Sequence, residues 1–128
     1  MILLDTSVAI PLRDGVVTIQ ERAKRVDEGG LAISAITLVE LEGGVYREPS
    51  ETAARRLRLD KLLTIVRVLP FEGAVASRYG EIVRDIGYSR RKLLDRMMAA
   101  HALVHGIPLA TLNPADFSDI PGLQVEAW

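Results

Sequence analysis

The sequence predicts a single α/β domain whose central sheet is mainly parallel and flanked by helices. Short apolar segments alternate with stretches of helical periodicity, and no internal repeat or linker divides residues 1–128. The first segment, residues 1–4, is apolar without interruption, which is typical of a strand covered on both faces of a parallel sheet. A chain of 128 residues is also long enough to bury the core of one such domain.

The N-terminal half is predicted to contain two strands and four helical segments. Pro11 should stop the first helical turn, and the glycine pair at 29–30 should follow the end of the second helix. In chain order we expect a strand (1–4), a short helical turn (7–12), an amphipathic helix (16–26), a strand (31–34) and two helices (35–46 and 51–63).

The C-terminal half continues the alternation of strands and helices. Gly87 and Gly106 are well placed as the glycines that end two helices, and Asn113 with Pro114 predicts a turn. In chain order we expect a strand (64–69), two helices (75–86 and 92–105), a strand (107–111) and a last edge strand (123–128).

The composition excludes several kinds of site. Without cysteine the chain has no disulfide, thiolate metal site or cysteine nucleophile, and two histidines argue against a histidine-rich zinc site. No apolar run approaches the length of a membrane span. The first residues lack the basic segment of a signal peptide and place Asp5 where such a peptide is apolar, so we expect a cytoplasmic protein.

The charge is unevenly distributed along the chain. The segment from Arg55 to Arg96 has eleven basic and five acidic residues, whereas the remainder has five basic and twelve acidic residues. A basic region beside an acidic one is typical of a protein that binds a polyanion next to a carboxylate site. Solvated helix faces rich in arginine would give the same pattern, and the composition leaves both interpretations open.

Four carboxylates each follow a strand or lie near the start of a helix: Asp5, Glu40, Asp95 and Asp116. In a parallel sheet these positions share one edge, where ligands bind. Each also has a purely structural interpretation. Asp5 could cap the following helix, Glu40 could form a capping box with Thr37, Asp95 could interact with a helix dipole, and Asp116 could stabilise a turn.

If the four carboxylates meet, their like charges repel, so some must be protonated or a cation must bind. Hard oxygen ligands without cysteine or histidine select Mg²⁺ or Mn²⁺. Such ions can generate a hydroxide nucleophile and stabilise an in-line displacement at phosphorus. The sequence therefore predicts a metal-dependent phosphoryl-transfer site.

Five segments, in this order and over essentially the whole chain, carry a resemblance to a known family. They are LLDTS at 3–7, TLVEL at 37–41 with Gly44, DRMMAAHA at 95–102, TLNPADF at 111–117 and IPGL at 120–123. The chain resembles the PIN-domain family, specifically the VapC-type toxic endoribonucleases of bacterial and archaeal toxin–antitoxin pairs.

The resemblance implies cleavage of RNA by the four acids around one or two divalent ions, Mg²⁺ or Mn²⁺. Asp5 and Asp95 would ligate the metal, and Glu40 and Asp116 would hold metal or orient the attacking water. Metal, water or phosphate would be supported by Thr6 or Ser7 and by Thr111 or Asn113. The resemblance also implies a homodimer and a cognate VapB-type antitoxin that blocks the acidic crevice.

The chain departs from the family pattern around the third acid. Arg96 follows Asp95 where the family has a small or apolar residue, and Met97 and Met98 replace branched aliphatic residues. We expect the local cations to contact RNA phosphates: Arg90, Arg91, Lys92 and Arg96. The neighbouring acids Glu42 and Asp119 are assigned to the surface.

Two other functions are compatible with a chain of this length and α/β plan. A phosphoacceptor signalling domain would need an acidic pair at the first strand and a lysine after the fifth. Asp5 has no acidic neighbour, and no lysine follows residue 92, so the sequence argues against this function. A catalytically inactive PIN fold that binds RNA or protein stays open, although such scaffolds usually lose acids and all four are present here.

Overall fold

The computed structural model describes residues 1–26 and 29–128 and contains a five-stranded sheet in the order β3-β2-β1-β4-β5. Every neighbouring pair in this sheet is parallel, which confirms the predicted fold class. The strands are β1 (Ile2–Leu4), β2 (Leu31–Ser34), β3 (Val66–Leu69), β4 (Leu109–Thr111) and β5 (Val125–Ala127).

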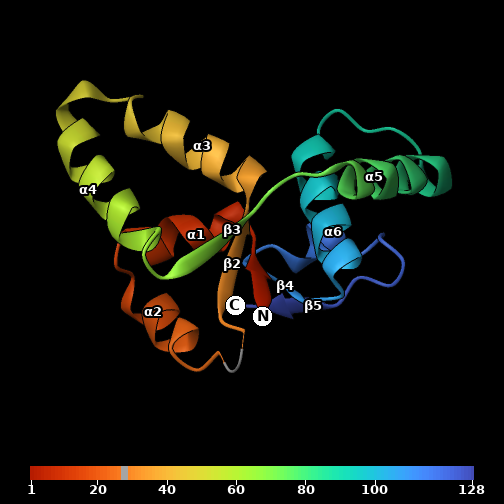
Figure 1. The fold of residues 1–128 in the computed structure, drawn as a ribbon, viewed down its shortest axis with the longest axis horizontal. Coiled ribbons are helices and arrows are strands. Elements are labelled where there is room, and N and C mark those ends of the chain that lie inside the picture. Colours follow the sequence, from red (N-terminus) through yellow and green to blue (C-terminus); the bar gives the residue numbers. More distant parts are fainter. Residues whose placement is uncertain (27–28) are drawn as a thin grey trace.

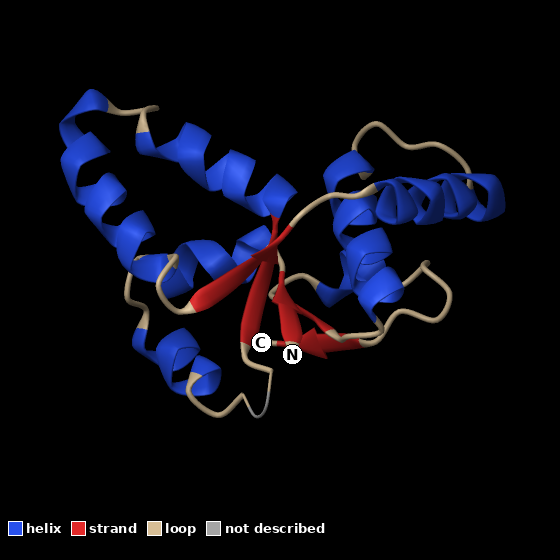
Figure 2. Cartoon of the chain, viewed as in Figure 1, coloured by secondary structure: helices blue, strands red, loops and turns tan. Residues whose placement is uncertain are grey.

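Helices cover both faces of the sheet (Figure 1, Figure 2). The first four helices lie to one side in this view, and α5 and α6 lie to the other. The helices are α1 (Thr6–Arg13), α2 (Val17–Ala23), α3 (Ala35–Val45), α4 (Thr52–Leu62), α5 (Gly73–Ile86) and α6 (Leu93–His105), with short 3₁₀ helices η1 (Pro49–Glu51) and η2 (Pro114–Phe117).

The central strand β1 is buried on both faces, as its apolar run predicted. Ile2 and Leu4 pack in the core shared with α1, α3 and α4, whereas Leu3 packs in the core shared with α5 and α6. Burial of each such leucine contributes about 1.5–3 kcal/mol to folding. The two cores fix β1, and therefore the residue that follows it, in the middle of the molecule.

The strand order reverses direction at β1. From β1 the chain crosses to β2 on one side and then to β3, while β4 and β5 build the other side of the sheet. Connections therefore leave the carboxyl ends of β1 and β4 in opposite directions. This is the place where open parallel sheets form a ligand-binding crevice.

The ends of α1, α3 and α4 lie within one residue of their predicted positions, whereas α2 ends three residues early. The helix α1 runs through Pro11 to Arg13 because Val8, Ala9 and Leu12 form one buried stripe along it, and this packing outweighs the hydrogen bond that proline removes. The next helix ends at Ala23, earlier than predicted, since Ile19 is its one buried residue. Residues 27 and 28, next to the predicted end of that helix, lie outside the described residues.

The glycines that were expected to end helices do so. Gly87 follows α5 with φ of 85°, and Gly106 follows α6 with φ of 63°, a left-handed conformation that costs little without a Cβ atom.

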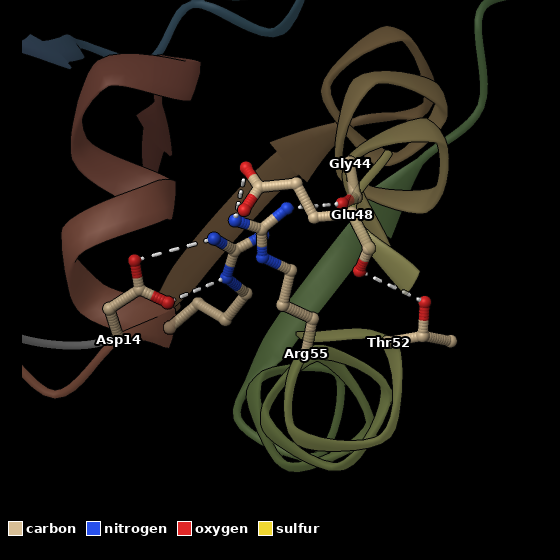
Figure 3. Close-up of polar contacts among 6 residues, drawn as sticks. Asp14, Gly44, Glu48, Thr52 and Arg55 are labelled. Atoms are coloured by element: carbon tan, nitrogen blue, oxygen red, sulfur yellow. Dashed lines mark hydrogen bonds and ion pairs between the residues drawn. The ribbon is translucent and has the colours of Figure 1, made fainter. Parts of the chain in front are cut away.

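A polar network fixes the turn between α3 and α4. Arg55 of α4 donates to the Gly44 carbonyl of α3 at 2.9 Å and to Glu48 at 3.2 Å, as Figure 3 shows. Thr52 also donates to the Glu48 carbonyl at 3.4 Å. These contacts hold the two helices as a hairpin, one arm of which carries Glu40 towards the sheet.

None of the helices described is long and apolar enough to cross a membrane.

Candidate active site

A cleft of about 510 Å³ lies at the carboxyl ends of β1 and β4, and the four predicted carboxylates all line it. They come from four places: Asp5 from the end of β1, Glu40 from α3, Asp95 from the first turn of α6 and Asp116 from η2. Among the described residues, a hollow of about 490 Å³ near Arg22 and Trp128 is lined by a single acid, Glu126. The chemistry therefore points to the first cleft.

Asp5 is buried and its carboxylate accepts three hydrogen bonds. Its Oδ1 accepts the Thr6 N–H at 2.8 Å, and its Oδ2 accepts the hydroxyls of Ser7 at 2.7 Å and Thr111 at 2.8 Å. Asp5 is thus the N-cap of α1, as its structural interpretation proposed, and at the same time a wall of the cleft. Three donors compensate the desolvation of its charge.

Ser7 and Thr111 are themselves fixed by the backbone that follows β4. The Ser7 hydroxyl accepts the Leu112 N–H at 3.1 Å, and the Thr111 hydroxyl accepts the Asn113 N–H at 3.0 Å. The predicted supporting residues Ser7 and Thr111 therefore hold Asp5 and join β1 to β4. The side chain of Asn113 lines the cleft, while its backbone forms this turn.

Glu40 accepts the hydroxyl of Thr6 at 2.8 Å. The capping-box interpretation of Glu40 is wrong, because Ser34 is the N-cap of α3 and accepts an N–H of the first turn at 3.1 Å. The Thr37 hydroxyl instead donates to the sulfur of Met98 at 3.3 Å and lies 3.2 Å from the Thr6 hydroxyl. The sequence did not indicate a role in the site for Thr37 and Met98, whose side chains contact the Thr6 hydroxyl.

Asp95 is half-buried, and its carboxylate accepts no hydrogen bond from the residues described. Burial, and then the negative charges of Asp5, Asp116 and Glu40, raise the pKa of Asp95 from 3.8 to about 6, against an opposing effect of Lys92. Each of the other three acids acts on Asp95, so the cleft concentrates negative charge where a cation would relieve it.

Asp116 lies in η2 and closes its turn through a backbone hydrogen bond to Asn113 at 3.1 Å. The turn-forming interpretation is therefore correct for its backbone, while its half-buried carboxylate lines the cleft.

The predicted RNA contacts divide into two groups. Arg90 and Arg91 are exposed and line the same cleft as the acids, and Lys92 is 3.5 Å from Asp119. Arg96 is the exception, because it does not line the cleft. Its side chain is 6% exposed and donates to the Gly87 carbonyl at 2.6 Å and to Asp119 at 3.3 Å.

The two acids assigned to the surface lie outside the cleft, each paired with arginine. Glu42 accepts both Arg56 Nη groups, at 2.6 and 3.1 Å, and this contact lowers the pKa of Glu42. Asp119 is exposed and pairs with Arg96.

The donor set fits a hard divalent cation by its chemistry, since it consists of carboxylate and hydroxyl oxygens. As they are placed, no three acidic or histidine side chains in the described part of the chain are close enough to hold one ion. The Oδ2 atom of Asp5 accepts the hydroxyls of Ser7 and Thr111, whereas no residue in the described part of the chain donates to the Asp95 carboxylate. A cation would therefore have to draw Asp95 and its neighbours together.

The comparisons with known proteins agree with this geometry. The family model described as PIN domain matches residues 2–123. The chain is 33% identical to Ribonuclease VapC1 of Rickettsia felis, over 97% of this chain and 93% of that protein. It is 29% identical to the tRNA(fMet)-specific endonuclease VapC of Shigella flexneri, over 98% of this chain and 96% of that protein.

Solved structures show the same fold. VapBC2 from Rickettsia felis, bound to a DNA fragment from the promoter, matches with a TM-score of 0.87 and 25% identity, over 100% of this chain and 99% of that one. DNA-bound VapBC from Salmonella typhimurium matches with a TM-score of 0.85 and 26% identity, over 99% and 97%.

The raised pKa of Asp95 predicts a pH-dependent stability. Because the folded protein binds this proton more tightly than the unfolded chain, Asp95 contributes stability below about pH 4 that is lost as the pH rises to about 6. Without metal, Asp95→Asn should therefore melt close to wild type at pH 4 and about 2–5 °C higher at pH 7. Thermal melts in EDTA across this range, with Asp60→Asn as the control, measure it. A lower melting temperature for Asp95→Asn at pH 7 would identify Asp95 as a structural residue.

Proposed function

The chain belongs to the PIN-domain family, and from this we propose that it is a metal-dependent endoribonuclease, the toxin of a VapBC-type toxin–antitoxin pair. The observation that carries the proposal is the convergence of Asp5, Glu40, Asp95 and Asp116 in one cleft, with the raised pKa of Asp95. The relatives named VapC ribonucleases support RNA as the substrate.

In the proposed mechanism Asp5 and Asp95 hold Mg²⁺ or Mn²⁺. The ion, when bound, makes a water nucleophilic at neutral pH and neutralises charge on the scissile phosphate. Asp5 is held in place by its three donors, so little ordering is needed at that ligand. Glu40, which accepts the Thr6 hydroxyl, would orient the attacking water and accept its proton, and Asp116 would help to hold the metal.

The substrate would enter between the acids and the two exposed arginines of the cleft. Arg90 and Arg91 pair with phosphates on either side of the bond that is cut, and this contact makes binding dependent on salt. The same cations shield the RNA from the negative charge of the cleft. Without them a polyanion would be repelled from the carboxylates that must act on it.

The proposal also names partners. The solved VapBC complexes support a VapB-type antitoxin, and we propose a homodimer as the toxin's own assembly. RNA and antitoxin would both be met in the cytoplasm.

Asp5→Asn should abolish cleavage while the protein stays folded. Asparagine keeps the shape but loses the charge that binds the metal, so the rate should fall at least about a hundredfold, since even residues that only orient a metal ligand are worth 10–100-fold. Asp14→Asn is the matched control, because Asp14 is outside the cleft and pairs with Arg13 at 3.0 Å.

The measurement is cleavage of single-stranded RNA and of tRNA in Mn²⁺, with circular dichroism as the test of folding. Full activity of a pure Asp5→Asn sample would contradict the assignment of Asp5. A wild-type protein that binds these RNAs but never cuts them would favour the inactive scaffold.

Mn²⁺ should stabilise the wild-type fold. An ion that binds only the folded state contributes about 2.7 kcal/mol at a hundredfold excess over its Kd, which corresponds to about 5 °C or more in melting temperature for a domain of this size. Asp95→Asn should shrink this response. Coincident wild-type melting curves in EDTA and in millimolar Mn²⁺ would show that the carboxylates bind no ion.

A cognate antitoxin should place an arginine or lysine among the acids. A charge-assisted hydrogen bond to Asp95 or Asp116 would be lost in the corresponding asparagine variant, so the antitoxin should bind it about tenfold or more weakly. Calorimetry with the antitoxin measures this, with Asp60→Asn as the control. Equal affinity for Asp95→Asn, Asp116→Asn and wild type would show that inhibition acts outside the cleft.

A further inference from the structure

Arg96 is a nearly buried cation next to Asp95, whose carboxylate accepts no hydrogen bond from the described residues. It follows Asp95 on α6, and its side chain is 6% exposed. Two of its donors are used, by the Gly87 carbonyl at 2.6 Å and by Asp119 at 3.3 Å, while its Nε has no partner among the described residues. Burial of a charge with an unused donor is costly, so the contacts that remain must hold it firmly.

These contacts join three separate segments. Gly87 ends α5, Arg96 lies in the first turns of α6, and Asp119 follows η2. Lys92 reaches the same Asp119 oxygen at 3.5 Å. The loop tied to Arg96 at Gly87 carries Arg90 and Arg91, and the segment tied at Asp119 carries Asp116.

The two elements that Arg96 and Asp119 connect are also the elements that repel each other. Asp95 on α6 and Asp116 in η2 are like charges that line the same cleft. The residues of the attractive pair lie close to these acids in the sequence, since Arg96 follows Asp95 directly and Asp119 lies three residues after Asp116. The ion pair therefore connects the same two elements, α6 and the η2 segment. The attraction therefore opposes the repulsion across the same interface.

We propose that the Arg96–Asp119 ion pair is a positioning device that keeps Asp95 and Asp116 beside one cleft, so that a divalent ion can draw the two carboxylates together. Through Gly87 the same arginine keeps the loop of Arg90 and Arg91 at the cleft. The inference rests on the proposed function and deepens it, since it assigns a role to a cation that does not itself touch the substrate.

Asp119→Asn is the most direct test, because Asp119 is exposed and the variant removes charge without changing shape. Its Mn²⁺ Kd, measured by calorimetry without RNA, should rise about fivefold, the equivalent of about 1 kcal/mol of lost ion-pair energy. Its kcat at saturating Mn²⁺ should stay within about twofold of wild type, because the bound ion then overcomes the repulsion. Asp60→Asn, which breaks the 2.9 Å pair of Arg56 on α4, is the matched control and should leave the Mn²⁺ Kd unchanged.

Arg96→Met supplies a second arm. It should weaken Mn²⁺ binding at least as much as Asp119→Asn. The double variant should bind Mn²⁺ little more weakly than Arg96→Met, since only the 3.5 Å pair of Lys92 with Asp119 is left for the second substitution to remove. In metal-free protein, amides of residues 113–120 should exchange hydrogen faster in both variants than in Asp60→Asn.

The outcomes separate this inference from the proposed function. An Asp119→Asn protein with the Mn²⁺ Kd of wild type, or one whose lost activity excess Mn²⁺ does not restore, would overturn the positioning role and leave the nuclease standing. A wild-type protein that binds Mn²⁺ and shows the fivefold effect, yet cuts no RNA, would overturn the nuclease and support the positioning role.

Discussion

Repulsion among four carboxylates in one cleft is the constraint on which the rest of the site depends. The carboxylates differ in the number of hydrogen bonds that compensate their charge. Asp5 is compensated by three hydrogen-bond donors and Glu40 by one, whereas the carboxylates of Asp95 and Asp116 accept none from the described residues. At Asp95, burial and the neighbouring acids raise the pKa to about 6. The negative charge of Asp5 after β1 is therefore compensated by hydrogen bonds, whereas that of Asp95 on α6 is not. A bound cation would thus gain the most electrostatic free energy next to Asp95.

The parallel topology forces this concentration of charge. Since β1 is central and the order reverses beside it, residues that follow β1 and β4 must share one edge with the start of α6. Ser7 and Thr111 connect the two strands through the same Asp5 oxygen, so the fold and the site use the same hydrogen bonds. Loss of either hydroxyl would loosen both.

The strands and helices could be predicted from local patterns, namely apolar runs and glycines that end helices. Their alternation predicted a parallel sheet. The four acids could be predicted because each follows a strand or lies near the start of a helix. The alternatives for Asp5 were not exclusive, since one carboxylate caps α1 with one oxygen and faces Ser7 and Thr111 with the other. Pro11 does not end α1, because the buried face of this short helix stabilises it on both sides of the proline. Arg96 could not be read from the sequence, because its burial depends on Asp119, a partner 23 residues away.

The same electrostatics links activity with inhibition under the proposed function. The negative charge of the cleft can be neutralised by a divalent ion or by a cationic side chain. Both would act at Asp95, to which none of the residues described donates a hydrogen bond. Because the two cations relieve the same repulsion, each lowers the benefit of the other, so metal and antitoxin would be coupled unfavourably. Arg96 does not take part in this exchange, because it does not line the cleft and its charge is paired with Asp119. The ion pair can therefore hold the elements together whichever cation is bound.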